Sequence, residues 1–283
     1  MKTFLKIWLS ISFIAIGIGI GLLFIAAGTG ARWEDASAFS DMNESYEGIE
    51  RLNFDISYGE VKIVKGNEFS ISAKNILEDE LDSYVTDGTW YIKEDDSKFI
   101  NVFGLRLPSR HIISWGDHFL PRITITIPED FEAENYILSI AAGSVEAEKI
   151  NAAEGEFTVE AGSLVIDQLT VTDKSKYKVG TGEMQLLDID VKDITVDCGV
   201  GKVDIDGTII GDNNITCGIG DVDIDLNGDE VDYSYQISCG IGDVDIDGDS
   251  YNSISNKIIN NKNANNNLYL DCGVGSISVD FNE

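Results

Sequence analysis

Aspartates spaced two residues apart are the side chains best suited to chemistry in this chain. Three segments, read Gly-Lys-Val-Asp-Ile-Asp once and Gly-Asp-Val-Asp-Ile-Asp twice, begin at Gly201, Gly220 and Gly242. Calcium prefers carboxylate oxygens as ligands. The weak calcium candidates are Asp204, Asp206, Asp223, Asp225, Asp245 and Asp247. The sequence favours the alternative, a solvated acidic face, because calcium-binding β-rolls repeat a nonapeptide with Gly-Gly-x-Gly-x-Asp turns.

An aromatic segment at residues 97–119 is the second group that could bind something. It contains both histidines of the chain. Exposed aromatic loops often carry binding sites. The alternative, which the sequence favours, is a hydrophobic cap that covers the first unit of a repeat structure. The residues of this candidate binding loop are Phe103, His111, Trp115, His118 and Phe119.

Catalytic signatures are absent from the sequence. It contains no Gly-x-Ser-x-Gly and no His-Glu-x-x-His motif. A calcium-dependent enzyme acting on polysaccharides would need a basic residue above its carboxylates. Lys202 is the only basic residue next to the glycine of an aspartate-rich segment. We therefore predict a protein that is not an enzyme and has no cofactor. Calcium at these aspartates is the alternative.

A repeat near 20 residues determines the predicted fold. From the second to the last of eight glycines the spacings are 19, 20, 19, 19, 22 and 33 residues. Positions five and three before each glycine, and two and four after it, are apolar and alternate with mostly polar ones. This is the pattern of strands with one buried face on both sides of a corner. We predict an all-β, single-stranded β-solenoid with about 20 residues per rung. The glycines are Gly59, Gly143, Gly162, Gly182, Gly201, Gly220, Gly242 and Gly275.

The four cysteines all fall three residues before a repeat glycine, where other rungs carry Ile or Val. This position favours small, buried, free thiols. The alternative is one or two disulfides between stacked rungs. A linear ladder of thiols cannot surround zinc tetrahedrally. The residues are Cys198, Cys217, Cys239 and Cys272.

An apolar run at the N-terminus predicts one transmembrane helix. Residues 7–27 are 21 uncharged, mostly apolar positions, which is enough to span a bilayer. Lys2 and Lys6 precede the run and every acidic residue follows it, so the N-terminus is predicted to be cytoplasmic. The alternative is a cleaved signal peptide. Gly17 and Gly21 have the spacing of a helix-pairing motif.

The predicted domain layout follows from these features. Residues 1–30 form a cytoplasmic stub and signal-anchor, and residues 49–283 form the extracytoplasmic solenoid. An Asn- and Ser-rich stretch at residues 249–267 reads as a flexible lateral loop. The other parts are a juxtamembrane linker at 31–48, an irregular first part at 64–130 and regular rungs at 131–281.

The charge balance limits the partners of the chain. With 50 acidic and 20 basic residues, the formal net charge is −30. A nucleic-acid binder needs a clustered basic surface, so that class is excluded. The charge favours cationic partners, such as basic proteins, peptides or divalent ions.

Two segments give the chain a family resemblance. Residues 52–63 read LNFDISYGEVKI, and residues 122–129 read RITITIPE. Together with the rungs that follow, they resemble the bacterial "putative adhesin" family of unknown function, which includes LiaG-like membrane proteins of Gram-positive bacteria. The resemblance covers residues 49–281. It implies a cell-surface β-solenoid, sometimes associated with envelope-stress systems, and it brings no catalytic residues.

These features together predict a single-pass membrane protein with most of its chain outside the cytoplasm, on a Gram-positive cell surface. We expect an acidic, adhesin-like binding or scaffold module of the envelope. Its contact surface would be the acidic face of the solenoid or the aromatic loop. The alternative is an accessory protein of an envelope-stress sensing system, which would use its membrane helix for partner contact.

Overall fold

The computed structural model divides the chain into two units, residues 1–38 and 39–283, and the described residues all lie in the second. The predicted transmembrane segment lies outside the described residues. Among those that are described, no helix is long and apolar enough to cross a membrane. The described residues are 39–77, 81–94, 99–102, 105–108, 121–252, 255–259, 261 and 264–282.

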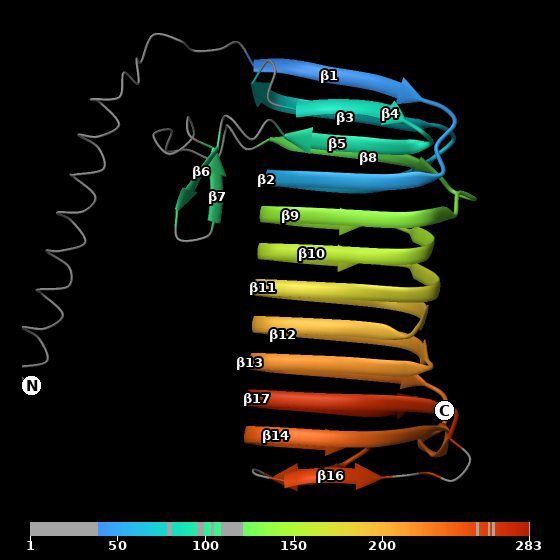
Figure 1. Cartoon of the computed structure of the whole chain (residues 1–283), viewed down its shortest axis with the longest axis vertical. Helices are drawn as coiled ribbons and strands as arrows, with labels where there is room; N and C mark the ends of the chain where they lie inside the picture. Colours follow the sequence, from blue (N-terminus) through green and yellow to red (C-terminus); the bar gives the residue numbers. More distant parts are fainter. Residues whose placement is uncertain are drawn as a thin grey trace, which may run out of the picture. The chain divides into compact units, whose positions relative to one another are not determined.

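Five long strands follow one another as successive rungs of a parallel stack (Figure 1). They are β9 (Ala133–Ala147), β10 (Ile150–Ile166), β11 (Leu169–Lys192), β12 (Ile194–Ile210) and β13 (Asp212–Asn227). The 17 residues of β10 would extend about 55 Å if straight. Only two residues separate β10 from β11, yet Ile150 lies beside Leu169 in parallel register. Each strand must therefore bend back on itself, and the chain is β-solenoid-like, as predicted.

The bend in each rung occurs at the repeat glycine, and these glycines pair in register from strand to strand. Gly220 has a φ of +146°, a conformation that L-residues rarely adopt. A Cβ at this position would lie 1.8 Å from the carbonyl oxygen of Gly201 on the neighbouring rung, β12. The repeat therefore needs glycine both for the backbone angle and for the close approach of neighbouring corners.

The core lies inside the bent strands, because residues at alternate positions along each rung are buried. The rings of Phe157 and Tyr177 stack there, with centroids 5.3 Å apart. All four cysteines are buried and free, as predicted. In the stack they follow the order Cys198, Cys217, Cys272, Cys239.

The last two rungs are not stacked in the order of the sequence. β17 (Asn266–Asn282) pairs with β13 on one side and with β14 (Tyr233–Ile246) on the other. Figure 1 shows the C-terminal strand inserted between them. The sequential stacking that the repeat suggests is therefore wrong at this end. The three rungs have the same Cys-Gly-x-Gly corner, so any of them can fit beside another.

Antiparallel strands cover the outer edge of β14. β15 (Asp249–Asn252) and β16 (Ser255–Ile259) both pair with it. The lateral loop predicted at residues 249–267 is therefore wrong, because much of this stretch forms a cap. Covering the last rung blocks pairing with another chain at an exposed sheet edge.

The opposite end of the stack is built from shorter strands. β2 (Arg51–Gly66) is the first rung, and it pairs with β9, β8 (Arg122–Pro128) and β5 (Thr89–Glu94). β3 (Phe69–Leu77) and β1 (Phe39–Tyr46) continue the sheet as antiparallel strands. β1 thus forms within the segment predicted as a juxtamembrane linker.

The remaining elements are short. β4 (Leu81–Thr86) and β5 form a hairpin around Asp87 and Gly88, both of which have positive φ. β6 (Phe99–Val102) and β7 (Leu105–Pro108) form a separate two-stranded sheet within the predicted aromatic loop. One 3-10 helix, η4 (Glu230–Asp232), precedes β14. Phe103, His111, Trp115, His118 and Phe119 lie outside the described residues, so the loop remains a prediction.

Candidate interaction surface

The residues three positions after the corner glycines form a column of aspartates that a serine interrupts. In the stack the order is Asp204, Asp223, Ser278 and Asp245, because β17 intervenes. The structure therefore brings Asp204 and Asp223 together on adjacent rungs and separates both from Asp245. These side chains are on the outward-facing positions of their strands, between buried residues.

The aspartates of this column have partners within the chain. The Nζ of Lys202 lies 2.6 Å from Asp204 Oδ1 and 3.2 Å from Asp223 Oδ2, so it bridges two rungs. The hydrogen bond with Asp204, followed by that with Asp223, raises the pKa of Lys202 above its ordinary value. Asp245 accepts hydrogen bonds from the backbone N–H of Gly248 at 3.0 Å and from Ser250 Oγ at 2.6 Å.

The column five residues after the corner is a continuous row of three carboxylates. Asp206, Asp225 and Asp280 lie side by side on β12, β13 and β17. Partial burial, and then the charges of Asp280 and Asp206, raise the pKa of Asp225 above its ordinary value. Asp247 lies five residues after Gly242 in the sequence but does not extend this row. It has a φ of +48° and, with Gly248, makes the turn between β14 and β15.

No group of three or more His, Cys, Asp or Glu side chains in the described part of the chain is placed to hold a metal ion. The solvated acidic face therefore stays the prediction, to be tested in solution against calcium binding at these aspartates. Together, the carboxylates of these columns attract cations over a broad area of the surface.

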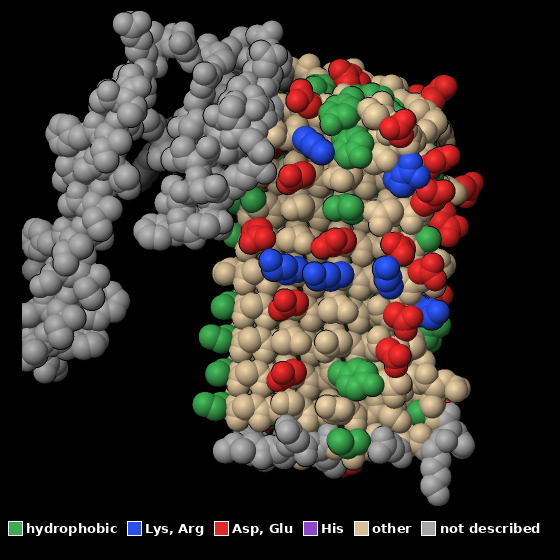
Figure 2. All heavy atoms as spheres, viewed as in Figure 1, with side chains coloured by type: hydrophobic (Ala, Val, Ile, Leu, Met, Phe, Trp, Pro, Cys, Tyr) green, Lys and Arg blue, Asp and Glu red, His purple; other side chains and the backbone are tan. Residues whose placement is uncertain are grey.

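The charge of the described rungs is unevenly distributed. On β10 and β11, lysines pair with glutamates across the strands: Lys174 with Glu154, Lys176 with Glu156 and Lys178 with Glu160. Figure 2 shows the lysines as a row across the middle of the stack. Residues 194–252 instead contain fourteen acidic residues and one basic residue, Lys202. The rungs β12, β13, β17 and β14, which we call the acidic rungs, hold eleven aspartates and one lysine, so few of their carboxylates are neutralised within the chain.

A column of exposed aliphatic side chains, which the sequence analysis missed, runs along the corner of the acidic rungs. It consists of the residues just before the corner glycines, which pair in register and are 46%, 55%, 45% and 71% exposed. Figure 2 shows hydrophobic side chains in a row along one edge of these rungs. The recurring Cys-Gly-(Val/Ile)-Gly sequence was the signal that could have revealed it. We call Val200, Ile219, Val274 and Ile241 the aliphatic ladder.

The buried thiols behind this corner are unreactive in the folded chain. Burial is the largest cause that raises the pKa of Cys198, and it raises the pKa of Cys217 and of Cys272 to about 12. Since the thiolate is the reactive form, these cysteines act as apolar filling.

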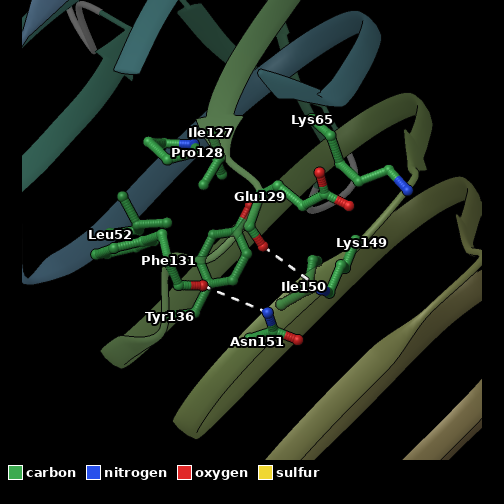
Figure 3. A pocket seen from close by; sticks show the side chains of 10 residues that line it. All are labelled: Leu52, Lys65, Ile127, Pro128, Glu129, Phe131, Tyr136, Lys149, Ile150 and Asn151. Carbon is green, nitrogen blue, oxygen red and sulfur yellow. Dashed lines mark hydrogen bonds between the residues drawn. The ribbon is translucent and has the colours of Figure 1, made fainter. Parts of the chain in front are cut away.

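A small pocket lies where β8 ends and the regular rungs begin (Figure 3). The side chain of Asn151 donates a hydrogen bond to the carbonyl oxygen of Phe131 at 3.5 Å, and Lys149 Nζ donates to that of Glu129 at 3.4 Å. Burial raises the pKa of Tyr136, which also lines the pocket. Both polar contacts go to the backbone, so these side chains hold the segment between β8 and β9 in place.

Comparison with known proteins gives one family and several matching structures. The model of the Toastrack DUF4097 family matches residues 49–280. Among curated proteins, none is significantly similar. A "putative cell adhesion protein" from Clostridium sporogenes is 15% identical, with 87% of this chain and 100% of that chain covered and a TM-score of 0.36. A "putative adhesin" from Bacteroides fragilis is 13% identical, with 86% and 98% covered and a TM-score of 0.34. A "putative lipid binding protein" from Parabacteroides distasonis is 14% identical, with 86% and 97% covered and a TM-score of 0.35.

Proposed function

Because the chain belongs to the Toastrack DUF4097 family, we propose that it is a non-catalytic, adhesin-like surface module that binds cationic partners on its acidic rungs. The family match confirms the resemblance seen in residues 52–63 and 122–129. The observation that carries the proposal is the uncompensated charge of residues 194–252, which hold fourteen acidic residues and one lysine.

The electrostatics of stacked rungs favour such binding. Neighbouring rungs lie about 4.8 Å apart, so carboxylates in one column repel each other by about 1 kcal/mol per pair in water. A cation placed between two rungs relieves this repulsion. Lys202 shows the geometry within the chain, since its ammonium group contacts Asp204 on its own rung and Asp223 on the next. A lysine of a partner would bind between Asp206 and Asp225 in the same way.

The proposed location rests on the N-terminal sequence. Residues 7–27 would anchor the chain in the plasma membrane, and Lys2 and Lys6 would keep the N-terminus in the cytoplasm. The acidic rungs would then face the envelope of a Gram-positive bacterium. The chain from untreated cells should be found in the membrane fraction, and protease added to intact cells should degrade the rungs. Protection of the rungs in intact cells would contradict this orientation.

Binding of a fluorescent octalysine peptide to the purified full-length chain tests the proposed function. The variant combines Asp206→Asn, Asp225→Asn, Asp243→Asn and Asp280→Asn. At about 0.2–1 kcal/mol for each exposed ion pair, four lost pairs amount to about 0.8–4 kcal/mol, so we expect its affinity to fall at least about fourfold.

A control variant removes the same number of charges from exposed positions outside the acidic rungs: Glu68→Gln, Asp82→Asn, Asp130→Asn and Glu132→Gln. It should bind octalysine nearly as the unaltered chain does. Equal losses in the two variants would mean that net charge alone attracts the peptide, and no binding by the unaltered chain would overturn the proposed function.

A further inference from the structure

We propose that the aliphatic ladder and the carboxylates beside it dock a basic amphipathic helix. This inference rests on the proposed function and specifies the chemistry of the partner. The ladder supplies an apolar contact line, and the acidic rungs supply charges on both sides of it.

The ladder is exposed because its neighbours along the chain are glycines. Each of its four residues lies between two glycines, so no other side chain of the corner covers it. The glycines before the ladder are required by packing, since a Cβ at Gly218 would lie 2.6 Å from the carbonyl oxygen of Gly199. The corner is therefore a narrow backbone ridge from which only the ladder projects.

The apolar column coincides with the acidic part of the molecule. On the rungs before β12, the same column holds Thr181, Ala161, Ala142 and, on β2, the aromatic Tyr58. Large aliphatic residues begin at Val200, on the first acidic rung. Two independent properties, apolar exposure and uncompensated negative charge, therefore occupy the same four rungs.

Exposed carboxylates flank the ladder on both sides. Asp197 and Asp271 lie three residues before Val200 and Val274, and Asp221 and Asp243 lie two residues after Ile219 and Ile241. Ser276 Oγ donates a hydrogen bond to Asp221 Oδ1 at 2.6 Å, which holds that carboxylate at the corner. A partner that fits this surface has an apolar stripe with cationic groups along both of its edges. That is the side-chain pattern of a basic amphipathic helix.

The spacing of the ladder also favours a helix over an extended peptide. Ladder residues are about 4.8 Å apart along the stack. On one face of a helix, neighbouring Cβ atoms are about 5–6 Å apart. Side chains on one face of an extended strand are separated by about 6.6 Å. Four rungs extend over about 14 Å, which corresponds to about ten residues of helix.

A second copy of this chain fits the surface less well. Four partly exposed aliphatic side chains present on the order of a few hundred Å². A stable protein interface buries about 800 Å² on each partner. Two acidic corners would also repel each other. An anionic membrane surface is disfavoured for the same reason.

The test uses the full-length chain in nanodiscs of zwitterionic lipid, with empty nanodiscs subtracted. The probe is the labelled helical peptide LKKLLKLLKKLLKL. The ladder variant combines Val200→Thr, Ile219→Thr, Val274→Thr and Ile241→Thr, because threonine already occupies this column at residue 181. The matched control carries Leu187→Thr, Ile210→Thr, Val231→Thr and Ile258→Thr, which remove four exposed aliphatic residues outside the ladder.

We expect the ladder variant to bind the probe at least tenfold more weakly and the control variant to bind it unchanged. The same peptide with serine in place of leucine should bind weakly to the unaltered chain. Equal affinity of the ladder variant and the unaltered chain for the leucine peptide would overturn the inference. In that case, retained binding of octalysine would leave the proposed function standing. Self-association of the unaltered chain that the ladder variant abolishes would identify a second copy as the occupant and would also overturn the inference.

Discussion

Replacing Gly220 with alanine should strongly destabilise the rung stack, because the corner has no room for a methyl group. The new Cβ would lie 1.8 Å from the carbonyl oxygen of Gly201, and a real Cβ contact is at least 3.0 Å. The obstructing atom is backbone, so the two corners must separate by more than 1 Å, and the hydrogen bonds between them weaken. The φ of +146° adds conformational strain.

The magnitude follows from two contributions. Overpacking of a tight contact costs about 1–3 kcal/mol, and an unfavourable backbone conformation costs about 1–3 kcal/mol. Gly220→Ala should therefore lower the free energy of unfolding by about 2–6 kcal/mol, a large part of the ~5–15 kcal/mol typical of a domain. Gly228→Ala is the matched control, because Gly228 has a φ of +123° but no atom within 4 Å of an added Cβ. The free energy of unfolding of Gly228→Ala should fall only by the contribution of the backbone conformation, about 1–3 kcal/mol.

Urea unfolding of the full-length chain, followed by far-ultraviolet circular dichroism, measures this difference. The entropic effect of a new methyl group on the unfolded chain is the same in both variants and cancels. Equal stability of Gly220→Ala and Gly228→Ala would refute the close packing of the corners.

Four further predictions test other parts of the structure. Asp223→Cys combined with Ser278→Cys should form a disulfide, because the two positions lie on adjacent rungs. Asp223→Cys combined with Asp245→Cys should not, because these positions are two rungs, about 9.6 Å, apart and a disulfide requires Cα atoms less than about 7 Å apart. The opposite result would contradict the inserted position of β17. Asp225→Asn should stabilise the fold at pH 7 by about 0.2–1 kcal/mol. Since folding raises the pKa of Asp225, its carboxylate destabilises the fold at neutral pH, and this effect disappears as the pH falls below the ordinary pKa of 3.8. The unfolding curves of Asp225→Asn and the unaltered chain should therefore converge at low pH. A gain in stability of the variant that persists at pH 3 would argue against a charge effect. The four cysteines should resist maleimide at pH 8 until the chain unfolds, and then all four should react; labelling of the native chain would contradict their burial. Millimolar calcium should change the melting temperature by less than about 2 °C, whereas a rise of many degrees that EDTA reverses would show a specific site.

The regular part of the fold was predictable because each rung contains the same local information. The glycine column fixed the register, and alternating apolar residues fixed which face is buried, so β9 to β13 lie where the repeat places them. The position of β17 was not predictable from this pattern. Its corner, Cys272 to Gly275, has the same side-chain types as those at Cys217 and Cys239. Only the long spacing of 33 residues before Gly275 hinted at a different path.

The candidate surface was predictable in its charge and not in its shape. The aspartate columns could be read from the sequence, but inserting β17 places Ser276 and Ser278 among them. The aliphatic ladder was missed because its column also contains Tyr58, Ala142 and Thr181 and so has no constant character. Exposure of an apolar residue depends on the backbone conformation of the corner, which the pattern of residue types does not specify.

Carbodiimide cross-linking of octalysine to the full-length chain, followed by peptide mapping, tests the central claim most directly. This reagent joins a lysine amine to a carboxylate that it contacts, so the adducts identify the carboxylates at the binding surface. We predict adducts concentrated on aspartates of β12, β13, β17 and β14, with their yield falling as salt screens the interaction. Adducts distributed over the described strands in proportion to their carboxylates would contradict it.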